Sequence, residues 1–362
     1  MILPGSDFPP DIRVEKETRL LRDNGHRVVV MCDMIKSQLA KQIWEGITII
    51  RRKRIPVPTL FEKFNGIPLW NSFLDWQWTK FITKVVQDES LDALHIHDLP
   101  KTAGAVATGK KLNLPVVVDL HENFPGSMHT YVEGLTGIRR RIFRLLINAR
   151  KWSEYEQKHV SQADHVIAVV SEAKERLINL GISKHKIAVI ENTEPLPEHR
   201  QAVDESIVNR YKDDFIILYV GGFGGRSNHR GLTTAVAAMP AVLKSIPHAH
   251  LLLVGKGTIK FLLDRMISDK GLENNVTIID WVPFEQVHSY IAASKVCLLP
   301  YTSTPNTEAS SPNKLYQYMS MGKPVVVSSC KSLKRVIEET GCGSVFQAGD
   351  PVDMARAIND LS

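Results

Sequence analysis

The sequence lacks the patterns that mark several common classes of protein. No apolar run approaches the length of a membrane span, and the N-terminus lacks the charged-then-apolar order of a signal peptide. The four cysteines form no CxxC pair and no His/Cys cluster with zinc spacing. We therefore expect a reduced, cytoplasmic protein with neither a disulfide framework nor a structural metal.

The chain also contains no aspartate pair of the DxD type. Such carboxylates commonly hold a divalent cation, which in turn holds a diphosphate. Without them, a diphosphate site would depend on arginine, lysine and helix N-termini. We therefore expect no metal and no cofactor at such a site.

What the sequence does contain is ordinary in amount. Its 362 residues, 43% hydrophobic and 23% charged, fit two globular domains that each bury a core. The net charge of +6 has its clearest clusters at residues 51–54 and 137–151. These clusters favour an anionic partner, although a solvated helix face is the commoner explanation of any one of them. Because the excess is confined to a few segments, we expect no nucleic acid partner.

Short β-branched runs alternate with longer helical patterns along both halves of the chain. The alternation pauses at the polar stretch 191–214 and restarts at Phe215–Val220. This order predicts βαβ units and parallel sheets covered on both faces. We therefore predict an α/β protein with two doubly wound, Rossmann-like domains, residues 1–198 and 199–362. Ligands of such sheets bind outside the carboxyl ends of the strands, and a cleft between two such domains is the natural active site.

The segment 308–327, EASSPNKLYQYMSMGKPVVV, carries the strongest chemical signal. It predicts a polar loop, a short helix that begins near Asn313, and then a buried strand. A helix start presents unpaired N–H groups and a partial positive charge, and Lys314 adds a full charge there. With Glu308 and Gln317 nearby to bind hydroxyls, the segment suits a nucleotide diphosphate that carries a sugar. An ordinary capped helix is the alternative.

A glycine-rich loop, GGFGGRSNHRGL, follows the first strand of the second domain. It places Arg226 and Arg230 just before the next helix, where two guanidinium groups suit a diphosphate. It is not a P-loop, because the GK[ST] ending is missing, and a glycine-rich turn with solvated arginines is the alternative. Two later loops, LLLVGKGT with Gly255 and Lys256 and DWVPFEQV with Val282, could line a base pocket or be plain connectors.

Loops after strands of the first domain carry further candidate groups. Gly5 lies in PGSDFPPDIRVEKE, where it would let the backbone approach a ligand closely, but this loop is no GxGxxG fingerprint and can be a plain turn. His95 and His97 point to one side of a strand and could bind a metal together, yet no third ligand stands at a suggestive spacing. His121 follows the next strand. A buried, hydrogen-bonded histidine is the alternative for each.

Residues 137–160 form a basic helical pattern with an apolar stripe of isoleucine, leucine and tryptophan. Such a helix could lie in a membrane interface, with its stripe inserted and its arginines on anionic head groups. The protein would then be peripheral on the inner face of the membrane. The alternative is a long surface helix that packs its stripe on the sheet.

In the order of its motifs the chain resembles the GT-B glycosyltransferases of family four: DFPPDIRVEKE, LHIHDLP, VVVDLHENFP, ADHVIAVVSEAKERL, YVGGFGG…RGL, HLLLVGKG, WVPFEQV and SSPNKLYQYMSMGKPVVVS. These motifs cover nearly the whole chain and are specific for the family rather than for the sugar. The resemblance implies a GT-B fold, with two Rossmann-like domains facing across a cleft. It also implies a nucleoside diphosphate sugar donor held mainly by the second domain, an acceptor hydroxyl, and metal-independent transfer with retention of configuration.

The resemblance also assigns roles to residues. His121 matches the family's active-site histidine beside the transferred sugar. Lys314 matches the phosphate-contacting helix start, and Arg230 matches a basic residue, usually lysine, that contacts the diphosphate. Gln317 falls where the second glutamate of the family's E-x7-E motif contacts the ribose.

Three positions depart from the family pattern. Ala309 stands eight residues before Gln317, so the first glutamate is displaced to Glu308. Gly222 replaces a basic residue usual in the glycine-rich loop, for which Arg226 could substitute. The family's closing helices are missing after Ser362.

We therefore expect His121 and Glu308 to act in catalysis. The expected donor-binding residues are Gly5, Arg226, Arg230, Gly255, Lys256, Val282, Asn313, Lys314, Leu315 and Gln317. A nucleotide-sugar epimerase or phosphorylase of the same architecture is an alternative, as is a catalytically degenerate subunit that binds a nucleotide sugar or a membrane. The sequence names neither the base, nor the sugar, nor the acceptor.

Overall fold

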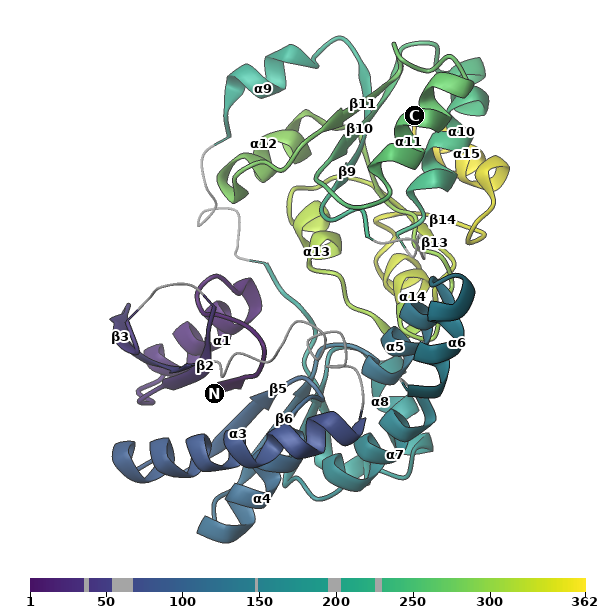
Figure 1. Cartoon of the computed structure of the whole chain (residues 1–362). Coiled ribbons are helices and arrows are strands. Elements are labelled where there is room, and N and C mark those ends of the chain that lie inside the picture. The colour runs from purple at the N-terminus through teal and green to yellow at the C-terminus, as the bar shows by residue number, and fades with distance from the viewer. Residues whose placement is uncertain (36–38, 54–67, 147–148, 195–202, 225–229) are drawn as a thin grey trace. The chain divides into compact units, whose positions relative to one another are not determined.

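The structure is a computed structural model that describes the chain except residues 36–38, 54–67, 147–148, 195–202 and 225–229 (Figure 1). The described residues form two compact units. The first contains Met1–His129 and Arg141–Ile190, and the second contains Thr130–Arg140 and Glu191–Ser362. The domain boundary predicted between residues 198 and 199 lies outside the described residues.

The first unit is built on an eight-stranded sheet with the order β3-β4-β2-β1-β5-β6-β7-β8. Neighbouring strands are parallel, except that β3 runs antiparallel to β4. The strands are β1 (Ile2–Leu3), β2 (Val29–Met34), β3 (Lys41–Trp44), β4 (Ile47–Lys53), β5 (Leu94–His97), β6 (Val116–Leu120), β7 (His165–Ala168) and β8 (Ile187–Val189). The inner strands are rich in buried valine and isoleucine, as expected of a parallel sheet covered on both faces.

The helices described within residues 1–190 connect these strands. They are α1 (Ile12–Asp23), α3 (Pro68–Glu89), α4 (Thr102–Leu112), α5 (Phe124–Glu133), α6 (Gly137–Leu146), α7 (Ala149–Val160), α8 (Ser171–Asn179) and the short 3-10 helix η1 (Lys184–Lys186). Among the described residues, none of the chain's helices is both long and apolar enough to cross a bilayer.

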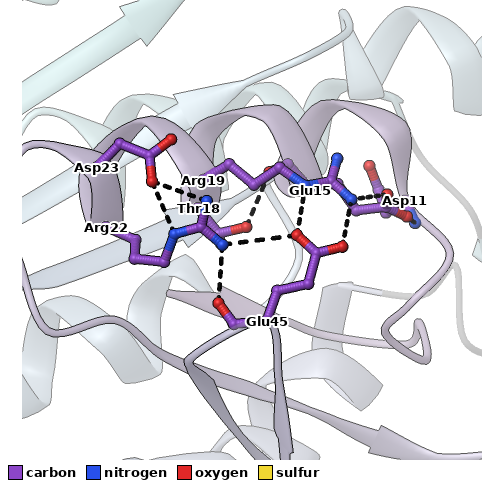
Figure 2. A network of polar contacts seen from close by, with 7 residues as sticks. All are labelled: Asp11, Glu15, Thr18, Arg19, Arg22, Asp23 and Glu45. Carbon is purple, nitrogen blue, oxygen red and sulfur yellow. Dashed lines mark hydrogen bonds and ion pairs between the residues drawn. The ribbon is translucent and has the colours of Figure 1, made fainter.

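The β3–β4 hairpin is an element that the sequence patterns did not predict. Its two-residue turn, Glu45 and Gly46, has positive φ at both positions, which matches the twist of an antiparallel pair. Polar contacts then hold the turn against α1 (Figure 2): Arg19 Nε donates to the Glu45 carboxylate at 2.8 Å, and Arg22 donates to the Glu45 carbonyl at 2.7 Å. Each exposed ion pair contributes about 1 kcal/mol or less, so the network positions the hairpin more than it stabilises the fold.

The second unit is built on a six-stranded, fully parallel sheet with the order β11-β10-β9-β12-β13-β14. The strands are β9 (Phe215–Val220), β10 (Ala249–Val254), β11 (Val276–Ile279), β12 (Val296–Leu299), β13 (Val325–Ser328) and β14 (Gly343–Phe346). Its helices are α9 (Glu205–Arg210), α10 (Leu232–Ser245), α11 (Lys260–Asp269), α12 (Phe284–Ala293), η3 (Thr307–Ala309), α13 (Asn313–Ser320), α14 (Lys331–Thr340) and α15 (Pro351–Asn359). Helices α10 and α15 pack side by side (Figure 1).

Each sheet has one point at which the order of strand addition reverses. In the first unit the chain adds β2 and β4 on one side of β1 and then returns to add β5 on the other side. In the second unit it adds β10 and β11 on one side of β9 and returns to add β12 on the other. Both sheets therefore confirm the predicted doubly wound α/β architecture. Ligands of such sheets bind at the carboxyl ends of the strands beside the reversal, which directs attention to the loops after β1, β5, β9 and β12.

Within the basic pattern at residues 51–54, Arg51 and Arg52 make contacts inside the fold, whereas Lys53 is exposed and residue 54 lies outside the described part. Arg51 is buried, pairs with Asp7 at 3.1 Å and donates to the Phe8 carbonyl at 2.7 Å. Arg52 pairs with the buried Asp33 carboxylate at 2.8 Å. These partners lie far away in sequence, so only the fold reveals them.

The basic helix predicted over residues 137–160 forms two helices, α6 and α7, with residues 147 and 148 outside the described part. The apolar side chains of the two helices differ in burial. Trp152 and Tyr155 of α7 are buried, whereas Ile138 and Leu145 of α6 are exposed. Only α6 therefore keeps an apolar stripe on the surface.

Candidate active site

At the strand reversal of the second unit, the loops after β9 and β12 and the start of α13 bring several polar groups together. Lys314, in the first turn of α13, is the most closely held of them. Its ammonium donates to the Tyr219 hydroxyl at 3.0 Å and lies 4.2 Å from the centre of the Tyr219 ring. The Tyr219 hydroxyl in turn donates to the Gly222 carbonyl at 2.8 Å. The ammonium is thus fixed at the carboxyl end of β9.

Two glycines allow the loops around Lys314 to approach this closely. Gly221 has a φ of +130°, and a Cβ added there would lie 2.4 Å from the Lys314 nitrogen. Gly255, predicted to bind the donor, has a φ of +140°, and its Cβ would lie 2.2 Å from the Gly221 carbonyl oxygen. A side chain at either position would force the loop away from the ammonium.

Arg230 brings a second cation to the same place. It precedes α10, and its guanidinium carbon lies 4.8 Å from the centre of the Tyr301 ring, at the end of β12. Burial, and then the nearby Arg230 charge, lower the pKa of Lys314 well below its ordinary value. A charge that is unfavourable in the ligand-free unit would become favourable beside an anion. Arg226, the other predicted arginine, lies outside the described residues.

The start of α13 is the third element of this arrangement. Pro312 precedes the helix, and its side chain makes no capping hydrogen bond. The Leu315 N–H donates to the Pro312 carbonyl at 3.0 Å, so the N–H groups of Asn313 and Lys314 are the ones left for water or a ligand. Asn313 opens the helix and is partly exposed. Leu315 is buried in the hydrophobic core, and Gln317 is also buried, so neither of these predicted residues presents an exposed side chain.

Glu308, predicted to be catalytic, has partners of its own. Its carboxylate accepts from the Ser303 hydroxyl at 2.5 Å and from the backbone N–H of Lys331 at 2.9 Å. Lys331 is the first residue of α14, so the carboxylate caps that helix and interacts favourably with its dipole. The carboxylate is therefore held by two contacts within its own unit.

The two candidate base-pocket loops meet through a residue that the sequence patterns did not single out. Trp281 is 63% exposed, and the Lys256 ammonium lies 6.0 Å from the centre of its ring. Val282, the predicted residue of this loop, is half-buried and packs against the core. An exposed indole beside a cation offers a flat apolar face, which suits stacking against a planar ring.

In the first unit, His121 lies in a cluster of histidines and carboxylates at the ends of β5 and β6. His121 Nε2 is 3.1 Å from His97 Nδ1 and 3.3 Å from Asp119 Oδ2, and His95 Nε2 is also 3.3 Å from that oxygen. The parallel register places His97 beside Asp119 on neighbouring strands. As predicted, His95 and His97 lie on the same side, with ring centres 4.4 Å apart.

Two carboxylates complete the cluster. Glu17 Oε2, from α1, lies 3.7 Å from His97 Nε2, and Asp98 Oδ1 lies 3.6 Å from His121 Nδ1. Neither carboxylate nor Asp119 was predicted. Asp119 was the easiest to find, because it precedes His121 by two residues, but Glu17 reaches the cluster only through the fold.

Electrostatics divides the cluster into charged and neutral members. Burial would raise the pKa of Asp119, but hydrogen bonds from His121 and His95 lower it below its ordinary value. Burial also opposes charge on His121, yet its hydrogen bond with Asp119 and the charge of Asp98 raise its pKa. Burial and then His95 lower the pKa of His97, while burial and then Asp119 raise the pKa of Glu17 to about 8. A charged His121–Asp119 pair is therefore favoured beside a neutral His97.

Gly5 lies in the loop after β1, on the other side of the same strand reversal. It adopts a φ of +82°, and a Cβ added there would meet nothing within 4 Å. Its N–H donates to the Asp33 carboxylate at 3.0 Å. The turn is thus built by a contact with the end of β2, and Gly5 itself is exposed.

Two family models match the chain and together cover most of it. Residues 13–193 match the model described as "Glycosyltransferase Family 4", and residues 214–362 match the model described as "Glycosyl transferases group 1". A curated relative is the alpha-D-kanosaminyltransferase of Streptomyces kanamyceticus. It is 23% identical over 352 residues, which cover 93% of this chain and 85% of the relative.

Solved structures share the fold at lower identity. Sucrose-phosphate synthase from Thermosynechococcus elongatus superposes with a TM-score of 0.74 at 18% identity, over 99% of this chain and 86% of that one. Anabaena HepE in complex with UDP-glucose gives a TM-score of 0.65 at 16% identity, over 99% of this chain and 88% of that one. These likenesses and the two doubly wound units confirm the predicted GT-B fold.

Proposed function

The chain belongs to the group 1 glycosyltransferases of family 4, and from this premise we propose a specific reaction for it. It moves a sugar from a nucleoside diphosphate sugar to an acceptor hydroxyl, with retention of configuration and without a metal ion. The donor binds to the second unit, at the reversal of its sheet. The first unit supplies His121 beside the transferred sugar.

The observation that carries this proposal is the pair of fixed cations beside an uncapped helix start. Lys314, Arg230 and the first N–H groups of α13 gather at the carboxyl ends of β9 and β12. A helix N-terminus and side-chain cations together form a site for phosphate oxygens. The complex of Anabaena HepE with UDP-glucose supports a donor of this chemical class.

The same groups support the chemistry of transfer. When the bond between the sugar and the diphosphate breaks, negative charge develops on the departing phosphate. Preorganised cations placed there stabilise the transition state more than the ground state, which is the usual source of such catalysis. The leaving phosphate can then accept the proton of the acceptor hydroxyl on the same face of the sugar, which yields retention. No DxD pair occurs in the chain to hold a cation, which supports transfer without one.

The position of Lys256 beside the Trp281 ring supports a binding site for the nucleotide base of the donor. The indole is exposed, and the ammonium beside it can contact a carbonyl of the base or a ribose hydroxyl. Both come from loops after β10 and β11, on the same edge of the sheet as Lys314. The base of the donor would therefore lie at these loops, and its diphosphate would lie at the start of α13.

A product assay tests the proposal directly. A thermal-shift panel of nucleotide sugars first selects the donor, because a ligand that binds only the folded state raises its apparent stability. The selected donor is then incubated with a panel of hydroxyl acceptors, and NMR follows the products. We expect release of the nucleoside diphosphate and a new glycosidic bond with the donor's anomeric configuration. Inversion would contradict the retaining mechanism.

One observation favours the alternative of a subunit that binds the donor without transferring it. Glu308, the displaced first glutamate, is held by the start of α14 at 2.9 Å. If it cannot leave that contact, the donor binds and stays intact. Donor-dependent stabilisation without release of nucleoside diphosphate for any acceptor would favour this alternative. Conversion of the sugar without release would favour an epimerase.

We also propose that the protein is cytoplasmic and binds peripherally to an anionic membrane, and that α6 makes this contact. Its apolar side chains at positions i, i+4 and i+7 lie on one face and are exposed: Ile138 by 74%, Ile142 by 46% and Leu145 by 79%. Arg141 and Arg144 of the same helix are exposed as well. An exposed apolar stripe beside basic side chains matches the interfacial region of a bilayer with anionic lipids.

A further inference from the structure

The turn that precedes α13 is held by side chains from two distant parts of the chain. The Asn192 side-chain amide donates to the Ser311 carbonyl at 2.5 Å, although the two residues lie 119 positions apart in sequence. The Ser332 hydroxyl, in the first turn of α14, donates to the neighbouring Ser310 carbonyl at 2.8 Å. Asn192 and Ser332 are both buried. Two successive carbonyls of one turn are thus each bound by a buried side chain.

Further contacts hold the segment that carries Asn192. Its neighbour Glu191 pairs with Arg335 of α14 at 2.9 Å. The Ser311 hydroxyl donates to the Tyr316 hydroxyl of α13 at 3.3 Å. All of these residues belong to the second unit, and Asn192 and Ser311 are each only 7% exposed. A buried carbonyl that loses its partner must stay unsatisfied or turn toward water, and either outcome would disturb the turn.

The orientation of this turn decides where the first N–H groups of α13 point. Pro312 follows the two carbonyls directly, and its ring fixes φ, here at −72°. Because the peptide units on both sides are planar, Pro312 passes the orientation of the turn on to Asn313 and Lys314. In an active site a displacement of about 1 Å can lower the rate on the order of 10²-fold. Groups that fix the turn therefore matter to the site without touching its ligand.

We propose that Asn192 and Ser332 are positioning residues for the donor site. They hold the turn at residues 310–312 so that the first N–H groups of α13 face the donor diphosphate. Neither side chain touches the donor, since each acts through a backbone carbonyl. The inference rests on the proposed function, because it names the residues that prepare the same site for its ligand. Asn192 lies where the chain enters the second unit, so the segment that joins the two units also supports the donor site.

Binding of nucleoside diphosphates to the full chain tests this role. Calorimetry with UDP, GDP, ADP and dTDP in turn identifies the one that wild-type protein binds. Asn192→Ala and Ser332→Ala should each weaken that affinity about tenfold, which is the scale of one lost hydrogen bond. In the transfer assay, KM for the donor should rise, whereas KM for the acceptor should not change, because the turn faces only the diphosphate.

Two variants elsewhere in the second unit are matched controls. The Asn275 amide donates to the Ala249 carbonyl at 3.4 Å, and the Ser294 hydroxyl donates to the Ile291 carbonyl at 2.8 Å. They precede β11 and β12, at the edge of the sheet opposite to the donor site. Asn275→Ala and Ser294→Ala lose the same kinds of contact, and thermal denaturation without ligand measures what each loss costs the fold. Their affinity for the nucleoside diphosphate should stay within a factor of two of wild type.

The outcomes distinguish failure of the inference from failure of the proposed function. A wild-type protein that binds none of the four nucleoside diphosphates would contradict the proposed function and, with it, the inference. If wild type binds one of them and folded Asn192→Ala and Ser332→Ala bind it equally well, the inference alone is wrong. Equal losses in the two control variants would also contradict it, since the effect would then follow stability. If one of the two site variants does not fold, the other decides.

Discussion

At the scale of single residues, the donor site depends on how Lys314 is held. Its ammonium donates to Tyr219, and that hydroxyl donates onward to a backbone carbonyl, so the cation cannot move freely. A side-chain nitrogen fixed before the ligand arrives needs little movement when negative charge develops beside it. The same argument applies to Arg230, which lies over the Tyr301 ring.

Replacing Lys314 or Arg230 with alanine should therefore lower kcat/KM about 30- to 10³-fold, because loss of one preorganised charge-stabilising donor costs roughly 2–4 kcal/mol. Steady-state kinetics with the selected donor measures the effect. Lys260→Ala is the matched control, since Lys260 is an exposed lysine of the same unit that pairs with Asp264 on its own helix. Values within a factor of two of wild type for both site variants would remove these residues from the site.

The lowered pKa of Lys314 predicts proton uptake when the donor binds. Burial and then Arg230 disfavour the charged ammonium in the free unit, whereas a diphosphate favours it. Binding should therefore raise this pKa, and the protein should take up protons between the two values. Calorimetry in buffers with different ionisation enthalpies should show a binding enthalpy that increases with that of the buffer. The dependence should vanish in Lys314→Gln, and an equal slope in that variant would assign the proton to another group.

At the scale of elements, α6 exposes an apolar stripe that we propose binds a membrane. Its exposed stripe is lined by arginines, and each basic residue near an anionic bilayer contributes about 1 kcal/mol. Salt should weaken this attraction, since the Debye length falls as ionic strength rises.

We expect the protein to pellet with vesicles that contain anionic lipid at low salt, and less at high salt. The double variant Arg141→Ala, Arg144→Ala should weaken binding by about 2 kcal/mol, roughly 30-fold. Leu145→Ser tests the stripe, and Lys84→Ala on α3, an exposed lysine paired with Asp88, is the control. Equal, negligible pelleting with neutral and anionic vesicles at low salt would show that α6 does not bind membranes.

The sequence predicted the sheets well because a strand buried on both faces is a nearly continuous apolar run, as in Phe215–Val220. It missed β3, since Lys41–Trp44 is an exposed edge strand whose pairing depends on a turn held against α1. The sequence predicted those site residues that lie close together along the chain. Lys314 is part of the helix whose start it supports, so the two are read together from the sequence. Glu17 and His97 meet only because α1 follows β1, the strand next to β5.

At the scale of the whole molecule, the proposed chemistry needs no metal, because side chains and a helix start meet the diphosphate. Saturating EDTA should therefore not lower the initial rate, measured with the selected donor and acceptor. The same assay in buffer without chelator is the matched control. A loss of activity that magnesium or manganese restores would mean that the donor is held through a cation.

The strand reversal in each sheet has a consequence for the ancestry of such proteins. Every described side chain of the proposed donor site lies in a single unit, between β9 and α14, while the histidine cluster lies entirely in the other unit. A change that alters which nucleotide sugar is accepted can therefore arise without disturbing the residues around His121. Recombination that exchanges the second half of the gene would then change the donor site in a single event and keep the histidine cluster.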